Sequence, residues 1–326
     1  MEENLLEIKN LTIHYVTDEA GICEAVNQVS FSLKKGETLG LVGETGAGKT
    51  TIARGIMRLV PDPPGKVISG QVLFKGNDLI KLKEKEMRKI RGNEISMIFQ
   101  DPMTALNPTD TVGDQIAEVL KYQKNLGKRE ARKQAVKMME MVGIPGARYD
   151  EYPHQFSGGM KQRIVIAIAL ACRPQLLIAD EPTTALDVTI QAQVLDIMRD
   201  LKNKLETSLI LITHDLGVVA EMCDWVAVIY AGEVVEYGRI EHIYDETAHP
   251  YTIGLFGALP QIDGIQERLK PVEGMMPDPA ALPKGCKFAP RCPHKTPSCE
   301  NEKIGFTELS KGHYVRCNFC KKKEGV

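Results

Sequence analysis

The first part of the chain alternates apolar and polar positions in short stretches. Because successive side chains of a strand point to opposite faces, this alternation predicts half-buried strands over residues 6–8, 11–15 and 29–33. Residues 39–42 form an apolar run that contains Gly40 and is followed by Gly43, which predicts a buried strand. Helical spacing follows over residues 50–59, and a further short strand is predicted at 72–74.

The character of the sequence changes after residue 81, where charged residues become frequent. Helical spacing at 116–122 and 128–142 predicts a helical insertion that ends near the turn at Pro153. Helices and strands then alternate in the order helix 160–171, strand 176–179, helix 190–205, strand 209–213, helix 216–223, strands 226–230 and 234–237. This alternation predicts a mainly parallel sheet covered by helices on both faces.

Prolines become frequent and regular patterns fade beyond about residue 260. We therefore expect an α/β domain over residues 1–260, with its helical part over about 81–170, and a separate, loop-rich extension over 261–326. The longest apolar run, 164–172, is half the length of the ~18 apolar residues that a membrane helix needs. Since no targeting segment is recognisable either, we expect a soluble protein of the cytoplasm, held at any membrane by other subunits.

Composition and charge narrow the class of protein further. Of the 326 residues, 43% are hydrophobic and 26% are charged, an ordinary mixture that can bury a full core. The formal net charge is -2, whereas a protein built mainly to coat nucleic acid needs a strong basic excess. Nucleic acid is therefore not expected as a partner.

A phosphate-binding loop lies between the predicted strand and helix, where residues 43–50 read Gly-Glu-Thr-Gly-Ala-Gly-Lys-Thr. Glycines allow the tight turn that brings backbone N–H groups onto phosphate oxygens, and the following helix adds its positive end. Lys49 is expected to reach the β- and γ-phosphates, and the Thr50 hydroxyl to bind Mg²⁺. The alternative, an exposed glycine-rich turn, fits the flanking strand and helix less well. The predicted nucleotide-binding residues of this segment are Gly43, Glu44, Thr45, Gly46, Ala47, Gly48, Lys49, Thr50 and Thr51.

A second apolar strand, over residues 176–179, is followed by two carboxylates, Asp180 and Glu181. A carboxylate at the carboxyl end of a buried strand lies near the phosphate loop in sheets of this kind. We expect Asp180 to hold Mg²⁺ through water and Glu181 to polarise the attacking water. Alone, the pair is equally typical of an acidic turn; the phosphate loop favours the functional interpretation.

Further segments occur in the order and spacing of one family. Residues 156–160, Phe-Ser-Gly-Gly-Met, resemble the signature motif of ABC ATPases, and Gln100 resembles the glutamine of their Q-loop. Residues 184–187 resemble the D-loop, His214 resembles the switch histidine, and Tyr15 stands where the family places an aromatic residue that stacks on adenine. Each segment alone has an ordinary structural explanation, such as surface packing for Tyr15, but together they are hard to obtain by chance.

The resemblance covers residues 5 to about 260 and implies a P-loop NTPase of ABC type. Such a fold has a mainly parallel sheet core, an antiparallel β subdomain and a helical subdomain, here followed by the loop-rich C-terminal extension. The implied activity is hydrolysis of ATP to ADP and phosphate. The catalytic residues that the resemblance implies are Lys49, Glu181 and His214.

In this family two ATPase domains meet head to tail, so each ATP lies between the phosphate loop of one chain and the signature motif of the other. The resemblance implies that Ser157, Gly158 and Gly159, at the start of a predicted helix, bind the partner's ATP. Gln100 would contact Mg²⁺ and the γ-phosphate, and His214 would contact the γ-phosphate and orient the attacking water.

Three segments resemble one branch of the family, the peptide permease ATPases. They are Met160 with the following Lys-Gln-Arg, residues 100–108 and residues 249–252. The combination implies the ATPase of a dipeptide or oligopeptide importer, although nickel importers share much of this sequence. It also implies a second ATPase subunit, with a paralogue favoured, two transmembrane permease subunits, an extracytoplasmic peptide-binding protein and a place on the cytoplasmic face of the membrane.

Rival classes remain, namely an ABC ATPase of DNA repair or translation, and a redox or nucleic-acid-binding iron–sulfur protein. A single phosphate loop and the lack of a long heptad run count against the first class. The near-neutral charge counts against the second.

Five of the eight cysteines lie at or after residue 286, and such crowding in a cytosolic protein indicates a metal site. Four thiolates suit tetrahedral Zn²⁺ and are also the usual requirement of a [4Fe–4S] cluster. Residues 285–293 resemble the cluster-binding tail of peptide permease ATPases, which favours iron–sulfur in a structural role. The implied ligands are Cys286, Cys292, Cys299 and Cys317, and Cys320 is then a spare thiol.

Overall fold

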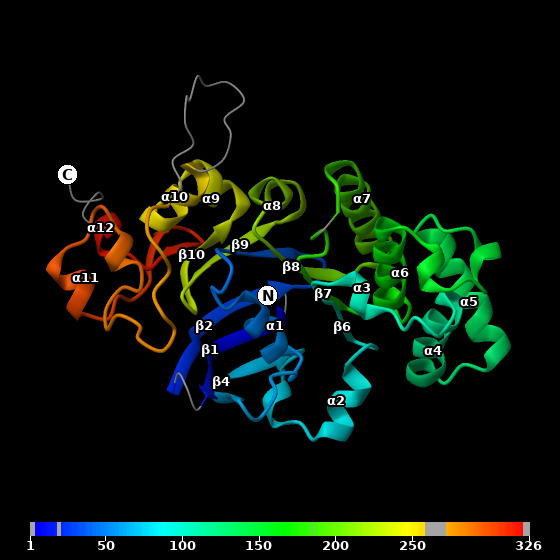
Figure 1. The fold of residues 1–326 in the computed structure, drawn as a ribbon. Helices are drawn as coiled ribbons and strands as arrows, with labels where there is room; N and C mark the ends of the chain where they lie inside the picture. Colours follow the sequence, from blue (N-terminus) through cyan, green and yellow to red (C-terminus); the bar gives the residue numbers. More distant parts are fainter. Residues whose placement is uncertain (1–3, 18–20, 185, 258–271, 322–326) are drawn as a thin grey trace. The chain divides into compact units, whose positions relative to one another are not determined.

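The computed structural model describes residues 4–17, 21–184, 186–257 and 272–321 (Figure 1). The chain divides into two compact units. The first unit contains residues 1–5, 33–38 and 78–212, and the second contains residues 6–32, 39–77 and 213–326. None of the described helices combines the length and the hydrophobicity needed to span a membrane.

The first unit is built on three parallel strands, β6 (Ile95–Ile98), β7 (Leu176–Asp180) and β8 (Ser208–Thr213). Every residue of these strands is buried, which is why the sequence shows continuous apolar runs here rather than alternation. The register places Ile98 opposite Ala179 and Asp180 opposite Ile212. The buried core therefore carries Asp180 to the carboxyl end of β7.

The helical insertion belongs to the first unit and centres on α4 and α5. The ring of Tyr149 lies so close to Gly113 in α4 that a Cβ atom there would be 2.2 Å from it. The Tyr149 hydroxyl donates to Asp114 Oδ1 at 2.8 Å, and Thr111 caps α4 by accepting the Asp114 N–H. The helical elements of this unit are α2 (Glu84–Ile90), α3 (Pro102–Ala105), α4 (Val112–Lys124), α5 (Lys128–Met141), α6 (Gly158–Leu170), α7 (Val188–Leu205) and the 3₁₀ turns η1 (Leu79–Lys81), η2 (Gly146–Arg148) and η3 (Pro153–Gln155).

The second unit contains strands of two sheets. One sheet has the order β2 (Gly21–Lys34), β1 (Asn4–Thr17), β4 (Gly65–Phe74), β5 (Asn77–Asp78), with β1 and β4 antiparallel. In the other sheet β3 (Thr38–Val42) pairs in parallel with β9 (Trp225–Tyr230), which pairs antiparallel with β10 (Glu233–Arg239). The helical elements of this unit are α1 (Lys49–Ile56), α8 (Leu216–Met222), α9 (Ile240–Asp245), α10 (Pro250–Gly257), α11 (Pro297–Asn301), α12 (Asn318–Lys321) and the 3₁₀ turn η4 (Ala289–Arg291).

The C-terminal extension differs from the separate appendage that the sequence predicts. Its strands β12 (His313–Val315) and β11 (Thr307–Ser310) continue the sheet beyond β10, with Glu236 opposite Val315. These strands have three and four residues, too few to show a period in the sequence. The limits 1–260 and 261–326 stay predictions.

The buried carboxylate of Glu236, in β10, links the extension to the rest of the sheet. It accepts the N–H groups of Ala248 and His249, both at 2.9 Å, and lies 2.9 Å from Nε2 of His313. Glu236 and His313 are both 0% exposed. Because a buried carboxylate must be hydrogen-bonded or paired, this cluster joins β10, the residues before α10 and β12 at one point.

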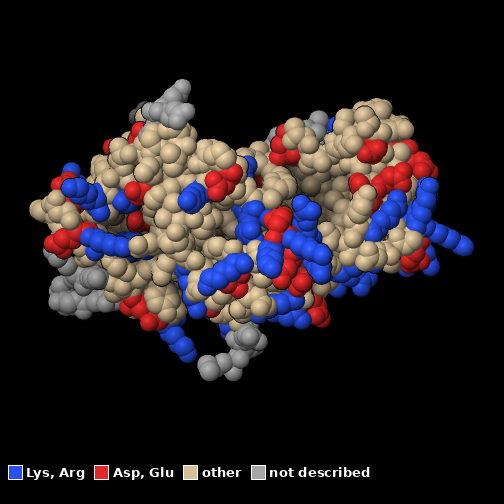
Figure 2. Space-filling model, turned by 90° about the horizontal axis from the view of Figure 1, so that it is seen from below, with Lys and Arg blue, Asp and Glu red and all other residues tan. Residues whose placement is uncertain are grey.

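Charge on the surface is mixed rather than gathered. On the face seen in Figure 2, Lys and Arg side chains are interspersed with Asp and Glu side chains. The net charge of -2 is thus a balance of many opposite charges.

Candidate nucleotide-binding site

The phosphate loop lies in the second unit, between β3 and α1, and its shape depends on two glycines. Gly43 has φ of 151° and a Cβ atom there would lie 2.1 Å from the Ile229 carbonyl oxygen. Gly48 has φ of 104° and a Cβ atom would lie 2.4 Å from the Ala25 carbonyl oxygen. No other residue type fits at either position, because the neighbours are backbone atoms that cannot turn aside. Gly48 begins α1 without a side-chain cap.

Lys49 is folded back onto this loop. Its side-chain nitrogen donates to the carbonyl oxygens of Gly43 at 2.7 Å and Glu44 at 2.9 Å, and the residue is only 5% exposed. The loop thus holds a buried cation beside its own backbone. This arrangement suits an anion that brings negative charge and acceptor oxygens to the loop.

A tyrosine that the sequence analysis did not assign to the site also holds the loop. The Tyr251 hydroxyl, 207 residues away in sequence, accepts the backbone N–H of Glu44 at 2.9 Å. His249 Nδ1 in turn accepts the Tyr251 N–H at 3.1 Å. The segment 249–252 therefore supplies a side chain, that of Tyr251, which holds the backbone of the phosphate loop.

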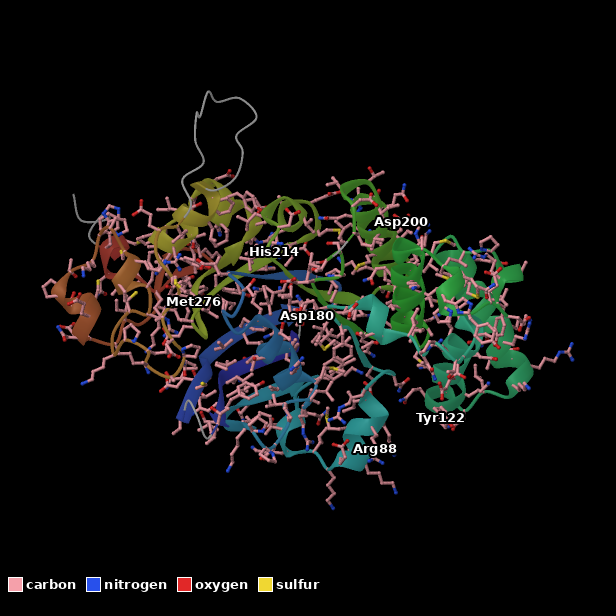
Figure 3. All side chains as sticks on the ribbon, viewed as in Figure 1. Arg88, Tyr122, Asp180, Asp200, His214 and Met276 are labelled. Atoms are coloured by element: carbon pink, nitrogen blue, oxygen red, sulfur yellow. The ribbon has the colours of Figure 1, made fainter. Side chains whose placement is uncertain are left out.

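Two further predicted residues of the second unit are Tyr15 and His214. Tyr15 is half-buried in β1 opposite Gly65, where its ring is 2.7 Å from the position of an added Cβ atom. His214 is exposed directly after β8 (Figure 3), while Asp215 caps α8 by accepting the N–H groups of Gly217 and Val218. The roles of Tyr15 and His214 stay predictions.

In the first unit the structure brings together two of the predicted residues. Gln100 donates from Nε2 to Glu181 Oε2 at 3.0 Å, and the hydroxyl of Thr184 donates to the same oxygen at 3.0 Å. The sequence analysis placed Thr184 in the D-loop without giving it a role. Glu181 follows the buried Asp180 (1% exposed; Figure 3) and has φ of 48°, a conformation that non-glycine residues rarely adopt. Such strain persists only where the surroundings fix it, and it is typical of functional sites.

The signature segment opens α6 in the same unit. Ser157 caps the helix by accepting the Met160 N–H at 3.4 Å, and Ser157 and Gly158 are exposed. Gly159 is buried, and a Cβ atom there would lie 2.4 Å from Ile190 of α7. Ser157 and Gly158 can therefore meet a ligand, whereas Gly159 allows α6 and α7 to pack closely.

The four predicted ligands of the cluster do not form a single closed site. Cys286 and Cys299 belong to one small apolar cluster, and Cys317 belongs to another. Burial first, and then the neighbouring thiols of Cys317, Cys299 and Cys292, raise the pKa of Cys286 to about 11. Within the described ranges, no group of three or more His, Cys, Asp or Glu side chains could hold a metal ion. The predicted [4Fe–4S] cluster is not confirmed.

Cys320, the spare thiol of the sequence prediction, is buried. It packs in the same apolar cluster as Cys317, and its thiol donates to the Ala248 carbonyl oxygen at 3.0 Å. A hydrogen bond from Cys320 is also the main reason that the pKa of Cys317 is lowered to about 6.

Comparison with known proteins identifies the family. The family described as "ABC transporter" matches residues 26–184, and that described as "Oligopeptide/dipeptide transporter, C-terminal region" matches residues 235–299. The dipeptide transport ATP-binding protein DppD of Bacillus subtilis (strain 168) is 52% identical over 317 residues, which cover 97% of this chain and 94% of that protein. The chain belongs to the ABC transporter ATP-binding proteins.

Other ABC proteins agree with this assignment. The oligopeptide transport ATP-binding protein OppD of Bacillus subtilis (strain 168) is 50% identical and covers 96% of this chain and 88% of that protein. A solved dimeric ATP-binding cassette, described as a post-hydrolysis state bound to ADP and Pi, has a TM-score of 0.65 at 28% identity. The match covers 72% of this chain and 98% of the solved cassette. The predicted ABC-type fold and the resemblance to the peptide permease branch are both confirmed.

The anchor at His249 should make the stability of this ABC ATPase depend on pH. Burial lowers the pKa of His249 to about 4, and the charge of Glu236 opposes this shift only in part. An unfolded histidine titrates near ~6.5, so between these values the unfolded chain binds more protons than the folded one. The contribution of the neutral, buried His249 to the free energy of unfolding should therefore be fully present above about pH 6.5 and should be lost as the pH falls toward 4.

The variant His249→Asn keeps an acceptor oxygen near the position of Nδ1 but cannot be protonated. We expect its free energy of unfolding, measured in urea at several pH values, to fall less steeply with decreasing pH than that of the wild type. The exposed His154→Asn should keep the wild-type slope. Equal slopes for His249→Asn and the wild type would contradict the prediction.

Proposed function

We propose that this ABC ATPase powers the import of dipeptides or oligopeptides across a membrane by hydrolysing ATP. The observation that carries the proposal is its near full-length similarity, at 52% and 50% identity, to proteins named for dipeptide and oligopeptide transport. The match of residues 235–299 to the C-terminal region of such transporters supports the same class of solute. The phosphate loop and the carboxylates bind no peptide, so the choice of peptide belongs to other subunits.

In this proposal the phosphate loop binds the triphosphate of ATP. Gly43 and Gly48 hold the backbone in a turn whose N–H groups, together with the first turn of α1, bind phosphate oxygens. Lys49 exchanges the carbonyl oxygens that it now contacts for oxygens of the β- and γ-phosphates. The ring of Tyr15 stacks on the adenine.

Oxygen donors of the chain fit Mg²⁺, which prefers hydroxyl, amide and carboxylate oxygens. The residues that would hold it are Thr50, Gln100 and Asp180. The amide nitrogen of Gln100 already donates to Glu181, which leaves the amide oxygen for a metal. When bound, Mg²⁺ neutralises charge that develops on the phosphates.

Glu181 acts as the base that orients and polarises the attacking water. Gln100 and Thr184 both donate to Oε2, so the carboxylate is held in one orientation before water arrives. In this proposal His214 contacts the γ-phosphate and orients the water. Gln100 thus links the γ-phosphate to the segment that leads into the helical insertion.

The exposed start of α6 supports a shared site. Ser157 and the N–H groups of Gly158 and Gly159 form an anion-binding helix end, and in this proposal they serve the ATP of a second ATPase subunit, a paralogue, arranged head to tail. Two transmembrane permease subunits hold the pair at the cytoplasmic face of the membrane. An extracytoplasmic peptide-binding protein delivers the solute.

Replacing Glu181 by Gln should nearly abolish hydrolysis while preserving ATP binding. The amide keeps the size of the side chain but cannot take a proton from water, so the rate should fall about a hundredfold or more. The variant should then accumulate as an ATP-bound pair of subunits, which size-exclusion chromatography with MgATP would detect. Glu118→Gln, on the exposed surface of α4, is the matched control. Phosphate release by Glu181→Gln at the wild-type rate would show that Glu181 is not the base.

Reconstitution tests the transport proposal directly. The subunit is assembled in proteoliposomes with candidate permease subunits, a partner ATPase and a peptide-binding protein, and uptake of labelled dipeptides and oligopeptides is measured. We expect uptake that requires ATP and that stops with Glu181→Gln. Uptake of nickel but of no peptide, or ATP hydrolysis without any transport, would overturn the assignment to peptides.

A second proposal concerns the extension: Cys286, Cys292, Cys299 and Cys317 bind a [4Fe–4S] cluster rather than Zn²⁺. Its support is that the extension provides four thiols, the usual number for such a cluster. The described side chains do not yet form a closed metal site. Its role in the proposal is to hold the extension in its fold.

Purification without air, followed by metal analysis, decides between the two metals. We expect iron, visible absorption near ~400 nm and no zinc, because thiolate-bound iron–sulfur clusters are coloured. Cys292→Ser should lose the iron, whereas Cys172→Ser, buried in the first unit, should keep it. A colourless protein with one zinc per chain would contradict the cluster.

A further inference from the structure

The C-terminal extension contacts the phosphate loop within the second unit through Arg291. The guanidinium Nη1 donates to both carboxylate oxygens of Glu44, each at 3.1 Å. The side chain of Arg291 is only 5% exposed and that of Glu44 is 32% exposed. Residues 247 positions apart in sequence therefore form an ion pair beside the residues that would bind ATP.

Arg291 is held firmly by the extension itself. Its Nε donates to the Glu273 carbonyl oxygen at 2.8 Å, and its Nη2 donates to the Val272 carbonyl oxygen at 3.0 Å. Nη1 also lies 3.4 Å from the Tyr230 hydroxyl. The guanidinium is thus fixed in position by neutral oxygens, and its charge is directed at one carboxylate, Glu44. A lysine could not make this set of contacts, because it has a single nitrogen.

Glu44 is fixed from both sides as well. Its N–H group is bound by Tyr251, and its carbonyl oxygen accepts from Lys49. Two residues further on, an added Cβ atom at Gly46 would lie 3.2 Å from the methyl group of Met276, a residue of the extension (Figure 3). These contacts fix the backbone of Glu44, and the two hydrogen bonds from Arg291 hold its carboxylate.

A carboxylate fixed in a phosphate-binding loop opposes the binding of an anion. ATP carries several negative charges, and like charges close together near a protein surface repel each other. An arginine in contact with the carboxylate cancels most of the repulsion that the carboxylate exerts on a nearby anion. Arg291 supplies this charge, and it does so only when the extension is folded against the loop.

We propose that Arg291 is a positioning residue for ATP binding: it neutralises and orients Glu44 and so makes the affinity of the phosphate loop for ATP depend on the folded C-terminal extension. The extension then sets how tightly this subunit binds ATP. Arg291 touches neither ATP nor the attacking water. Its removal changes the binding of nucleotide and leaves the chemical step in place.

The test compares Arg291→Gln, Glu44→Gln and the double variant in the full-length subunit, with MgATP as the probe. Equilibrium binding gives the dissociation constant, and steady-state hydrolysis gives KM and kcat. We expect Arg291→Gln to weaken MgATP binding about fivefold and to leave kcat within about twofold, because an uncompensated carboxylate remains in the loop. The double variant should bind MgATP more tightly than Arg291→Gln, because the repelling charge is gone.

Two comparisons separate charge from folding. The loss of MgATP affinity in Arg291→Gln should shrink to less than about twofold when the salt concentration rises from about 0.05 M to 0.5 M, since salt screens the repulsion between Glu44 and the phosphates. Arg291→Lys, which keeps the charge, should bind more tightly than Arg291→Gln. Lys295→Gln removes a charge from an exposed pair with Glu300 in the same extension and should bind MgATP as the wild type does.

Two outcomes would overturn the proposal: wild-type affinity in Arg291→Gln, or a double variant that binds as weakly as Arg291→Gln at every salt concentration. The second outcome would mean that Arg291 matters only for the fold. The inference rests on the proposed binding of ATP at the phosphate loop. A wild-type subunit that failed to bind MgATP would overturn that earlier proposal, and the two failures are therefore distinguishable.

Discussion

The buried carboxylate of Glu236 is the interaction on which the second unit depends. A charge removed from water is stable only if fixed partners replace the water, and here the partners come from two other segments of the chain. The two N–H donors belong to the turn that leads into α10, and the imidazole belongs to the last strand of the extension. Satisfying one carboxylate thereby fixes the place of Tyr251, and Tyr251 holds the backbone of the phosphate loop. A stable loop thus depends on a charge far from it in sequence.

Local patterns predict much of this molecule. The phosphate loop could be recognised because its glycines, Lys49 and Thr50 all lie within eight consecutive residues. Gly43 and Gly48 are needed there because backbone atoms of Ile229 and Ala25 leave no room for a side chain. The buried strands β6, β7 and β8 could be recognised because burial on both faces requires an unbroken apolar run. The carboxylate pair at the end of β7 and the capped start of α6 follow from the same kind of short-range rule.

The contacts that join distant segments could not be predicted in this way. Nothing near Glu44 indicates Arg291 or Tyr251, which lie 247 and 207 residues away. Tyr251 and Arg291 did stand in segments that resemble the peptide permease branch, but a resemblance does not show what a side chain touches. The sequence did not indicate that the extension continues the sheet, because strands of three and four residues leave no periodic signal. The spacing of the cysteines gave four thiols but not their division between two apolar clusters.

The close packing of α6 has a consequence for a pair of such subunits. Gly159 lets α6 approach Ile190 of α7, and the amide of Gln162 donates to the Pro182 carbonyl oxygen at 2.6 Å, directly after Glu181. The helix whose tip would serve a neighbour's nucleotide is therefore bonded to the turn that carries this subunit's own base. In a head-to-tail pair, any shift of that turn on loss of phosphate would move the tip of α6 at the opposite nucleotide. The two nucleotide sites of such a pair would therefore be mechanically coupled rather than independent.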